Sequence, residues 1–253
     1  MTPTNTTPVT IVTGGSRGIG AAIARRLAEA GHDIVITYQS NSAAADEVVA
    51  DVRKAGREAI AVPADMSNEA DIIAVFESAK EKFGAISGLV NNAGITGLLG
   101  KLVDQKTEDI QAVFNVNCVG LFLCCKYAAR QMSMSLGGHG GSIVNISSGA
   151  ATIGGPNEYV HYAASKAAVD AATMGLSKEL GLEGIRVNAV SPGAIYTELH
   201  AAGGQPDKAD RVGAGTPLGH AGEPEEIAHA VAWLMSGEAS YAAGAVLRVA
   251  GGR

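Results

Sequence analysis

The chain has 253 residues, a length that favours one large α/β domain over two. Hydrophobic residues make up 47% and charged residues 17%, so the composition is that of a folded protein and not of a disordered one. The formal net charge is −6 and no basic run occurs, which excludes nucleic acid and anionic membranes as expected partners.

Signals for export, membrane insertion or metal binding do not appear along the sequence. Residues 1–10 lack the basic and apolar regions of a signal peptide, and no uninterrupted apolar run reaches the ~18 residues of a membrane span. Cys118, Cys124 and Cys125 share one helical pattern without disulfide or zinc-site spacing, so we interpret them as buried thiols. We expect a cytoplasmic protein without a metal site, with a disordered tail over 1–8 and one domain over 9–253.

In chain order, short β-rich runs alternate with longer helical patterns. The expected strands are Val9–Thr13, Ile34–Tyr38, Ala59–Pro63, Leu89–Asn91, Ser142–Ser147, Ile185–Ser191 and Ala245–Val249. The expected helices are Gly18–Ala30, Ser42–Ala55, Asn68–Phe83, Thr107–Leu136, Tyr159–Leu182 and Pro224–Met235. This alternation predicts a single-domain, doubly wound Rossmann fold of the α/β class, with a seven-stranded parallel sheet and helices on both faces. Ligands in such sheets bind beyond the carboxyl ends of the strands.

The first strand leads directly into a glycine-rich turn, Thr13–Gly20, with the spacing G-x-x-x-G-x-G. Glycines allow a tight turn and a close approach of the backbone to a pyrophosphate, whose charge then meets the N-terminus of the following helix. The strand–turn–helix context makes this turn a candidate dinucleotide site.

The end of the second strand predicts the cofactor. Sites for NAD place Asp or Glu there to bind the ribose 2′-hydroxyl, but residues 37–41 contain no carboxylate. Asp46 and Glu47 follow too late in the chain. Arg17 in the glycine turn is placed to face a 2′-phosphate instead. The sequence therefore favours NADP(H) over NAD(H).

Tyr162 and Lys166 are a candidate reacting pair, because positions i and i+4 share one face of a helix. A nearby cation favours the phenolate and lowers the tyrosine pKa from its reference of about 10, which suits proton exchange with a carbonyl or alcohol oxygen. Ser147 and Ser148 end the preceding strand, at the edge where a substrate is expected, and Asn117 lies on the helix before that strand.

With these motifs in place, the sequence resembles the short-chain dehydrogenase/reductase family over nearly its whole length. The matching pieces, in chain order, are TGGSRGIG at Thr13–Gly20, Asp65, NNAG at Asn91–Gly94, NCVG at Asn117–Gly120, Ser147-Ser148, Tyr162-x-x-x-Lys166 and Pro192-Gly193 leading to Thr197. Many NADP-using members of the family carry an arginine at the end of the second strand, and this sequence has Gln39 at that place.

The resemblance implies a role for each matching residue. Tyr162 is implied as the general acid/base, Lys166 as the group that holds the nicotinamide ribose and tunes Tyr162, and Ser148 as a hydrogen-bond donor to the reacting oxygen. Asn117 is implied to hold a water in a proton relay. The remaining implied cofactor contacts are Gly14, Ser16, Arg17, Gly18, Ile19, Gly20, Tyr38, Ser40, Asp65, Met66, Asn91, Ala93, Gly94, Pro192, Gly193, Ile195 and Thr197.

Several other residues have a second interpretation. His161 adjoins Tyr162, but neighbours on a helix point about 100° apart, so we expect it to face elsewhere. Tyr159 lacks a lysine partner and is a candidate for the substrate wall. Trp233 lies among apolar residues and is expected in the core. The charged residues of 207–211 are expected to form an exposed face within a substrate lid over residues 194–217.

The family resemblance implies an oxidoreductase that moves a hydride between NADP(H) and a small carbonyl or alcohol substrate. An NAD-dependent dehydrogenase and a sensor that binds NADP(H) without turnover are the alternatives, and a lyase or epimerase on the same sheet is disfavoured. The resemblance is shared between ketoacyl-carrier-protein reductases and glucose 1-dehydrogenase-like enzymes, so the substrate stays open. It also implies a homotetramer formed through late helices and the last strand.

Overall fold

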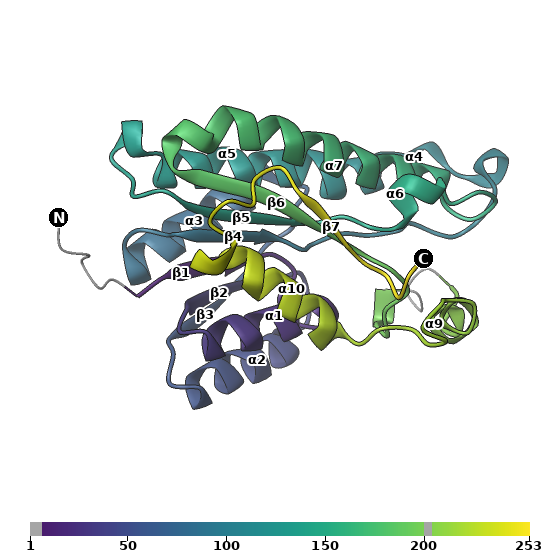
Figure 1. Cartoon of the computed structure of the whole chain (residues 1–253), viewed down its shortest axis with the longest axis horizontal. Helices are drawn as coiled ribbons and strands as arrows, with labels where there is room; N and C mark the ends of the chain where they lie inside the picture. The colour runs from purple at the N-terminus through teal and green to yellow at the C-terminus, as the bar shows by residue number, and fades with distance from the viewer. Residues whose placement is uncertain (1–6, 200–203) are drawn as a thin grey trace.

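The computed structural model describes residues 7–199 and 204–253, so most of the expected tail and residues 200–203 of the expected lid lie outside it. Its centre is a seven-stranded sheet in the order β3-β2-β1-β4-β5-β6-β7, in which all six pairings are parallel (Figure 1). The strands are β1 Val9–Val12, β2 Asp33–Tyr38, β3 Ala59–Pro63, β4 Gly88–Asn91, β5 Gly141–Ile146, β6 Ile185–Pro192 and β7 Val246–Val249. The predicted parallel sheet is confirmed.

Helices connect the strands and cover the sheet on both sides. They are α1 Gly18–Glu29, α2 Ser42–Lys54, α3 Glu69–Phe83, α4 Thr107–Phe114, α5 Leu121–Met132, α6 Ala150–Ile153, α7 Val160–Leu180, α9 Lys208–Gly213 and α10 Pro224–Met235. A π-helical segment, Asn115–Gly120, joins α4 to α5. Figure 1 shows α1, α2 and α10 on one side of the sheet and α3, α4, α5 and α7 on the other.

Local sequence signals explain where several helices begin and end. Gly31, the residue after the C-cap of α1, adopts φ +96°, a conformation that glycine takes without the strain of a side chain. Asn68 precedes α3, and its side chain accepts hydrogen bonds from the backbone of Ala70 and Asp71. At the start of α10, the Glu223 backbone N–H donates to Glu226 Oε2 at 2.8 Å, in a capping box that precedes a proline.

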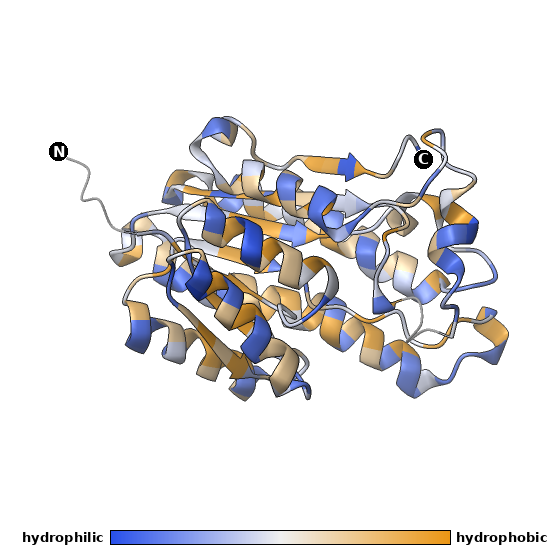
Figure 2. Cartoon of the chain, turned by 90° about the horizontal axis from the view of Figure 1, so that it is seen from below, coloured by the Kyte–Doolittle hydropathy of each residue, from blue (hydrophilic) through white to orange (hydrophobic). Residues whose placement is uncertain are grey.

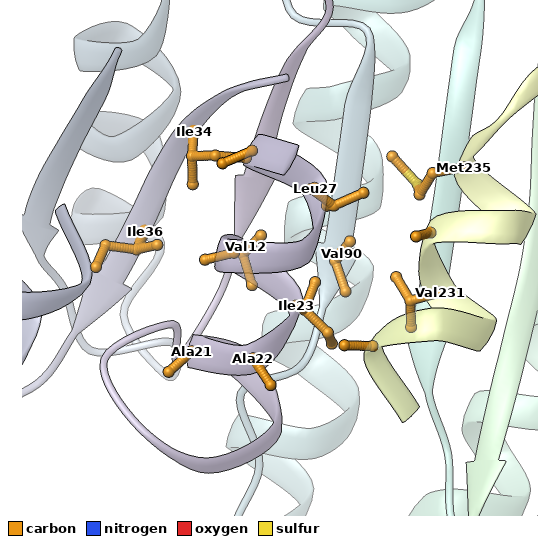
Figure 3. Close-up of a cluster of buried hydrophobic side chains, with 14 of the residues drawn as sticks. Val12, Ala21, Ala22, Ile23, Leu27, Ile34, Ile36, Val90, Val231 and Met235 are labelled. Carbon is orange, nitrogen blue, oxygen red and sulfur yellow. The ribbon is translucent and has the colours of Figure 1, made fainter. Parts of the chain in front are cut away.

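The core has two halves because the buried strands present apolar residues to both faces. In β1, Val12 packs with one half and its neighbour Ile11 with the other. Figure 3 shows the first half, where Val12 and Val90 of the sheet meet Ile23 of α1 and Val231 of α10. In Figure 2 the strands are predominantly hydrophobic, whereas the helices combine hydrophobic and hydrophilic residues. The sheet is therefore a rigid platform whose carboxyl edge carries the loops.

Two expectations about local structure are wrong. The helix expected to reach Leu136 ends at Met132, because Ser133 turns to extended backbone (φ −61°, ψ 129°) before a separate 3₁₀ turn at Met134–Leu136. Trp233 is 42% exposed and outside the core. The buried side of α10 is set by Ile227, Val231 and Leu234, at helical spacing, and Trp233 points away from it.

Among the described residues, one helical stretch, Thr107–Met132, has the length and composition of a membrane span, with a mean hydropathy of 1.5. It contains a π-helical step and the buried polar residue Asn117. Its apolar side chains, including Leu121 and Met132, pack into the core beside the sheet. Cys118, Cys124 and Cys125 are buried there as free thiols, as predicted.

Candidate active site

A cleft of about 1010 Å³ opens at the carboxyl edge of the sheet. It lies where the chain order reverses between β1 and β4, the position at which doubly wound sheets bind their ligands. One end is formed by the glycine turn and the end of β2, and the other by β5, the start of α7 and residues from 192 onward. The expected cofactor residues that line it are Gly14, Ser16, Arg17, Gly18, Ile19, Gly20, Tyr38, Ser40, Asp65, Met66, Ala93, Gly94, Pro192, Gly193, Ile195 and Thr197.

The glycine turn has no room for side chains at its key positions. Gly14 adopts φ +63°, and a Cβ on Gly20 would lie 2.3 Å from the Gly14 carbonyl oxygen. Gly18 also has a positive φ of +50° and lies where α1 begins, so the helix N-terminus faces the cleft. The close packing, the helix N-terminus and the size of the cleft fit a dinucleotide with its pyrophosphate against this turn.

Asn91, expected to line the cofactor cleft, turns its side chain into the protein, and its contact with a cofactor stays a prediction. Its side chain is buried and donates to Asn145 Oδ1 at 2.9 Å. The next residue, Asn92, lines the cleft instead and donates from Nδ2 to the carbonyl oxygens of Thr13 and Gly14, at 2.9 and 3.0 Å. Asn92 therefore fixes the glycine turn, a function that the sequence reasoning missed.

Charged and amide side chains bridge the adenosine end of the cleft. Arg17 Nη1 donates to Glu198 Oε2 at 2.8 Å, and both side chains are about two-thirds exposed. Gln39, in the place of the family arginine, donates to Asp65 Oδ2 at 3.4 Å. Two hydrogen bonds from Ser67, backbone and hydroxyl, hold the pKa of Asp65 below its ordinary value. Arg17 is the cation among these residues that is available for a 2′-phosphate.

Tyr162 and Lys166 lie together on the first turns of α7, both buried, at 7% and 4% exposure. Burial raises the pKa of Tyr162 to about 12, and a hydrogen bond with Ser148 acts in the opposite direction. The expected lowering by Lys166 is not seen in the free chain, because desolvation of the phenolate dominates. Tyr162 is therefore a protonated phenol at neutral pH, ready to donate to a carbonyl oxygen.

The Lys166 ammonium is held at the floor of the cleft. Its Nζ donates to the Ile146 carbonyl oxygen at 2.8 Å and lies 5.8 Å from the centre of the Tyr162 ring. A Cβ on Gly94 would lie 3.4 Å from this nitrogen, so the glycine leaves the ammonium accessible from the cofactor side. Burial lowers the pKa of Lys166 to about 8, which places its loss of charge close to physiological pH.

Asn117 occupies the π-helical segment and is 1% exposed, outside the cleft lining. Its Nδ2 donates to the Ile95 carbonyl and to Ser165 Oγ, and its Oδ1 accepts from the Ile95 backbone, all at 2.9–3.0 Å. Both amide N–H groups are thus used by the protein, so the side chain links the π-helical segment to Ile95 and Ser165, and the implied role of Asn117 in holding a relay water stays a prediction.

The two serines at the end of β5 differ in their surroundings. Ser147 is 2% exposed, and its hydroxyl donates to the Lys166 carbonyl at 3.3 Å. Ser148 is half-buried, its Oγ accepts from the Ala150 backbone at 3.1 Å, and its hydroxyl lies beside the Tyr162 hydroxyl at the cleft. The arrangement supports Ser148 as the residue that contacts the reacting oxygen.

Three further residues lie at or near the end of the cleft that contains Tyr162. His161 is buried and faces away from the cleft, with Nε2 3.1 Å from the Thr96 carbonyl oxygen, as expected. Tyr159 lines the cleft and meets Tyr162 edge to face, with ring centres 5.3 Å apart. Lys208 was expected on an exposed face and is 4% exposed, because its Nζ contacts Glu158 Oε2 at 2.6 Å. No local sequence signal predicts that contact.

Fold and cleft define the class: a Rossmann-fold oxidoreductase with a dinucleotide cleft and a tyrosine–lysine pair at one end. The family model described as enoyl-(acyl carrier protein) reductase matches residues 14–253. The chain belongs to the short-chain dehydrogenase/reductase family, as the sequence motifs predicted.

Individual relatives are similar to this chain in sequence over nearly its full length. The uncharacterized oxidoreductase YgfF of Escherichia coli (strain K12) is 45% identical, over 97% of this chain and 99% of that protein. A 3-oxoacyl-[acyl-carrier-protein] reductase of Synechocystis sp. is 40% identical, over 98% and 97%. A short-chain dehydrogenase from Burkholderia cenocepacia J2315, whose crystal structure is in complex with NADP, is 37% identical in sequence. The two structures match with a TM-score of 0.88 over 97% of each chain.

Proposed function

We propose that this protein is an NADP(H)-dependent enzyme that reduces a carbonyl group, or oxidises the corresponding alcohol, on a small molecule. The observation that carries the proposal is the placement of Tyr162, Ser148 and Lys166 at one end of a dinucleotide cleft. The NADP bound to the Burkholderia cenocepacia relative supports the choice of cofactor.

In the proposed mechanism the bound nicotinamide supplies the hydride for reduction and accepts it in oxidation. Tyr162 donates its phenolic proton to the carbonyl oxygen as negative charge develops there, and Ser148 donates a hydrogen bond to the same oxygen. Lys166 binds the nicotinamide ribose, and its charge lowers the cost of forming the Tyr162 phenolate. The glycine turn, fixed by Asn92, would hold the pyrophosphate, and Asn117 fixes the segment around Ile95.

NADPH is expected to bind at least about tenfold more tightly than NADH, a difference of roughly 1.4 kcal/mol. Arg17 would exchange its exposed, weak ion pair with Glu198 for a contact with the 2′-phosphate. Titration of both cofactors, followed by nicotinamide fluorescence, measures the ratio. Arg17→Met should abolish the preference and leave NADH affinity unchanged. Equal affinities in the wild type would support the NAD-dependent alternative.

Cofactor binding is expected to weaken as the pH rises through about 8. The Lys166 pKa of about 8 means that the ammonium is charged below this pH and neutral above it, and the charged form makes the stronger hydrogen bonds to ribose hydroxyls. The NADPH dissociation constant should rise by up to about tenfold per pH unit above the pKa. Lys166→Ala should bind weakly at pH 7 and lose this dependence; the same slope in that variant would assign the titration to another group.

We also propose a homotetramer, as the family resemblance implies. Trp233 on α10 and Val246 on β7 are 42% and 37% exposed, and Tyr241 between these elements is fully exposed. Exposed apolar groups of this kind mark association surfaces. Light scattering should give about four times the 25.6 kDa chain mass. Trp233→Arg should give a smaller species with unchanged circular dichroism. A monomeric wild type would contradict the proposal.

The competing non-catalytic function is a sensor that binds NADP(H) without turnover. The complete set of Ser148, Tyr162 and Lys166 argues against it, since a sensor has no need of a protonated phenol at the nicotinamide end. The deciding experiment is a screen of aldehydes, ketones, sugars and acyl thioesters, followed by NADPH absorbance. Tight NADPH binding without turnover of any of these compounds would favour the sensor.

A further inference from the structure

The wall of the cleft next to Tyr162 contains an ion pair between a buried lysine and a half-buried glutamate, which the catalytic proposal does not use. Lys208, on the short helix α9, is 4% exposed, and its Nζ lies 2.6 Å from Glu158 Oε2. The same nitrogen lies 3.9 Å from the centre of the Tyr159 ring. Burial of an ammonium costs free energy unless its charge and its donors are satisfied. Its position at a pocket wall therefore calls for a function.

The pair is firmly held at the substrate end. The Glu158 carbonyl oxygen accepts a hydrogen bond from the Gly100 backbone at 2.7 Å, which links its loop to the segment after β4. Tyr159, the next residue, contacts Tyr162 edge to face. Lys208 and Glu158 both line the cleft and are separated from the candidate acid by one aromatic ring. Atoms of a substrate beyond its reacting carbonyl are thus within reach of the pair.

Both members have unused hydrogen-bonding capacity. An ammonium has three N–H donors, of which one binds Glu158 and another faces the Tyr159 ring. Within the described part of the chain, no hydrogen bond reaches Glu158 Oε1, and this side chain is 30% exposed. The wall therefore offers one strong donor and one strong acceptor side by side. A hydroxyl group accepts from the first and donates to the second.

We propose that Lys208 and Glu158 select substrates that carry hydroxyl groups beyond the reacting carbonyl, which makes a polyhydroxylated aldehyde or ketone the preferred substrate class. This inference rests on the proposed reductase activity. The pair is neutral as a whole, so it gives a carboxylate little advantage, because Glu158 opposes the attraction of Lys208. An alkyl chain desolvates the remaining N–H donor of Lys208 and the Oε1 acceptor of Glu158 without hydrogen bonding to either, which is unfavourable.

Matched aldehydes test the proposal. The substrates are 2,3-dihydroxypropanal against propanal, and 2,3,4-trihydroxybutanal against butanal, each with NADPH. The wild type should prefer the hydroxylated member of each pair by at least about tenfold in kcat/KM. Lys208→Met keeps the alkyl stem over Tyr159 but removes the donor, and Glu158→Gln keeps the shape but removes the charge. In both variants the preference should fall severalfold, through KM more than kcat.

Comparing each variant with the wild type on the same aldehyde cancels differences in aldehyde hydration. Lys178→Met is the control, since it removes an exposed cation of α7 that does not line the cleft. It should keep the wild-type preference. Equal losses for both members of a pair in Lys208→Met would make the ion pair purely structural and overturn the inference; if that variant does not fold, Glu158→Gln decides alone.

Two further outcomes separate this inference from the proposed function. A wild type that reduces propanal and butanal better than their hydroxylated partners overturns the substrate class and leaves the reductase proposal standing. Absence of NADPH oxidation with all four aldehydes, and with the wider carbonyl screen, overturns both.

Discussion

Replacement of Tyr162 by phenylalanine is expected to lower kcat by about 10²–10⁴-fold, the range typical of a lost general acid or base. The ring stays in place, so packing against Tyr159 at 5.3 Å and the walls of the cleft are preserved. Only the proton donor is removed. Because burial raises the Tyr162 pKa to about 12, the hydroxyl carries its proton at neutral pH, and its loss stops donation to the carbonyl oxygen.

Single-turnover kinetics with bound NADPH measure the chemical step, and fluorescence titration shows whether NADPH still binds near wild-type affinity. Tyr127→Phe is the matched control. Tyr127 lies on α5, outside the cleft lining, and its hydroxyl donates to Glu69 of α3 at 2.8 Å. It should keep full activity. A Tyr162→Phe enzyme that retains most of its rate would contradict the assignment of the acid, whatever the substrate.

The fold could be predicted because its signals are local and repeated. The β-rich runs and their glycine-terminated helices place each strand within one residue of its observed ends, as in Ala59–Pro63. The cleft followed from the order of these elements, because parallel strands bring their carboxyl ends, and the motifs that follow them, to one edge. Tyr162 and Lys166 were found for a similar reason, since an i,i+4 spacing on a helix is legible in the sequence.

What could not be predicted depends on contacts between distant segments. Lys208 looked like a surface lysine because its partner, Glu158, is 50 residues away in the chain. Asn91 ends β4 and Asn92 follows it, and their side chains point in different directions, so the motif alone did not show which of them holds the glycine turn. The burial that sets the Tyr162 pKa belongs to the assembled walls, and the pair of residues alone suggested the opposite direction.

Ser148→Ala is expected to lower kcat by about 10²–10³-fold, as the loss of a donor to a developing oxyanion does. The Ser148 Oγ accepts from the Ala150 backbone, and its hydroxyl lies beside that of Tyr162 at the cleft, where both can donate to the same substrate oxygen. The hydrogen bond from this neutral donor becomes stronger as negative charge builds on the substrate oxygen. The effect should therefore appear in kcat, with NADPH affinity unchanged.

Ser147→Ala provides the comparison, since the two hydroxyls stand on adjacent residues at the end of one strand and so face different ways. The Ser147 hydroxyl is committed to the Lys166 carbonyl at 3.3 Å and is almost fully buried. Its removal takes away one internal hydrogen bond, worth about 0.5–1.5 kcal/mol of stability, and should cost kcat much less. Thermal unfolding and kcat, measured on both variants, separate the two roles. If Ser147→Ala lost more activity than Ser148→Ala, the contact with the reacting oxygen would belong to Ser147.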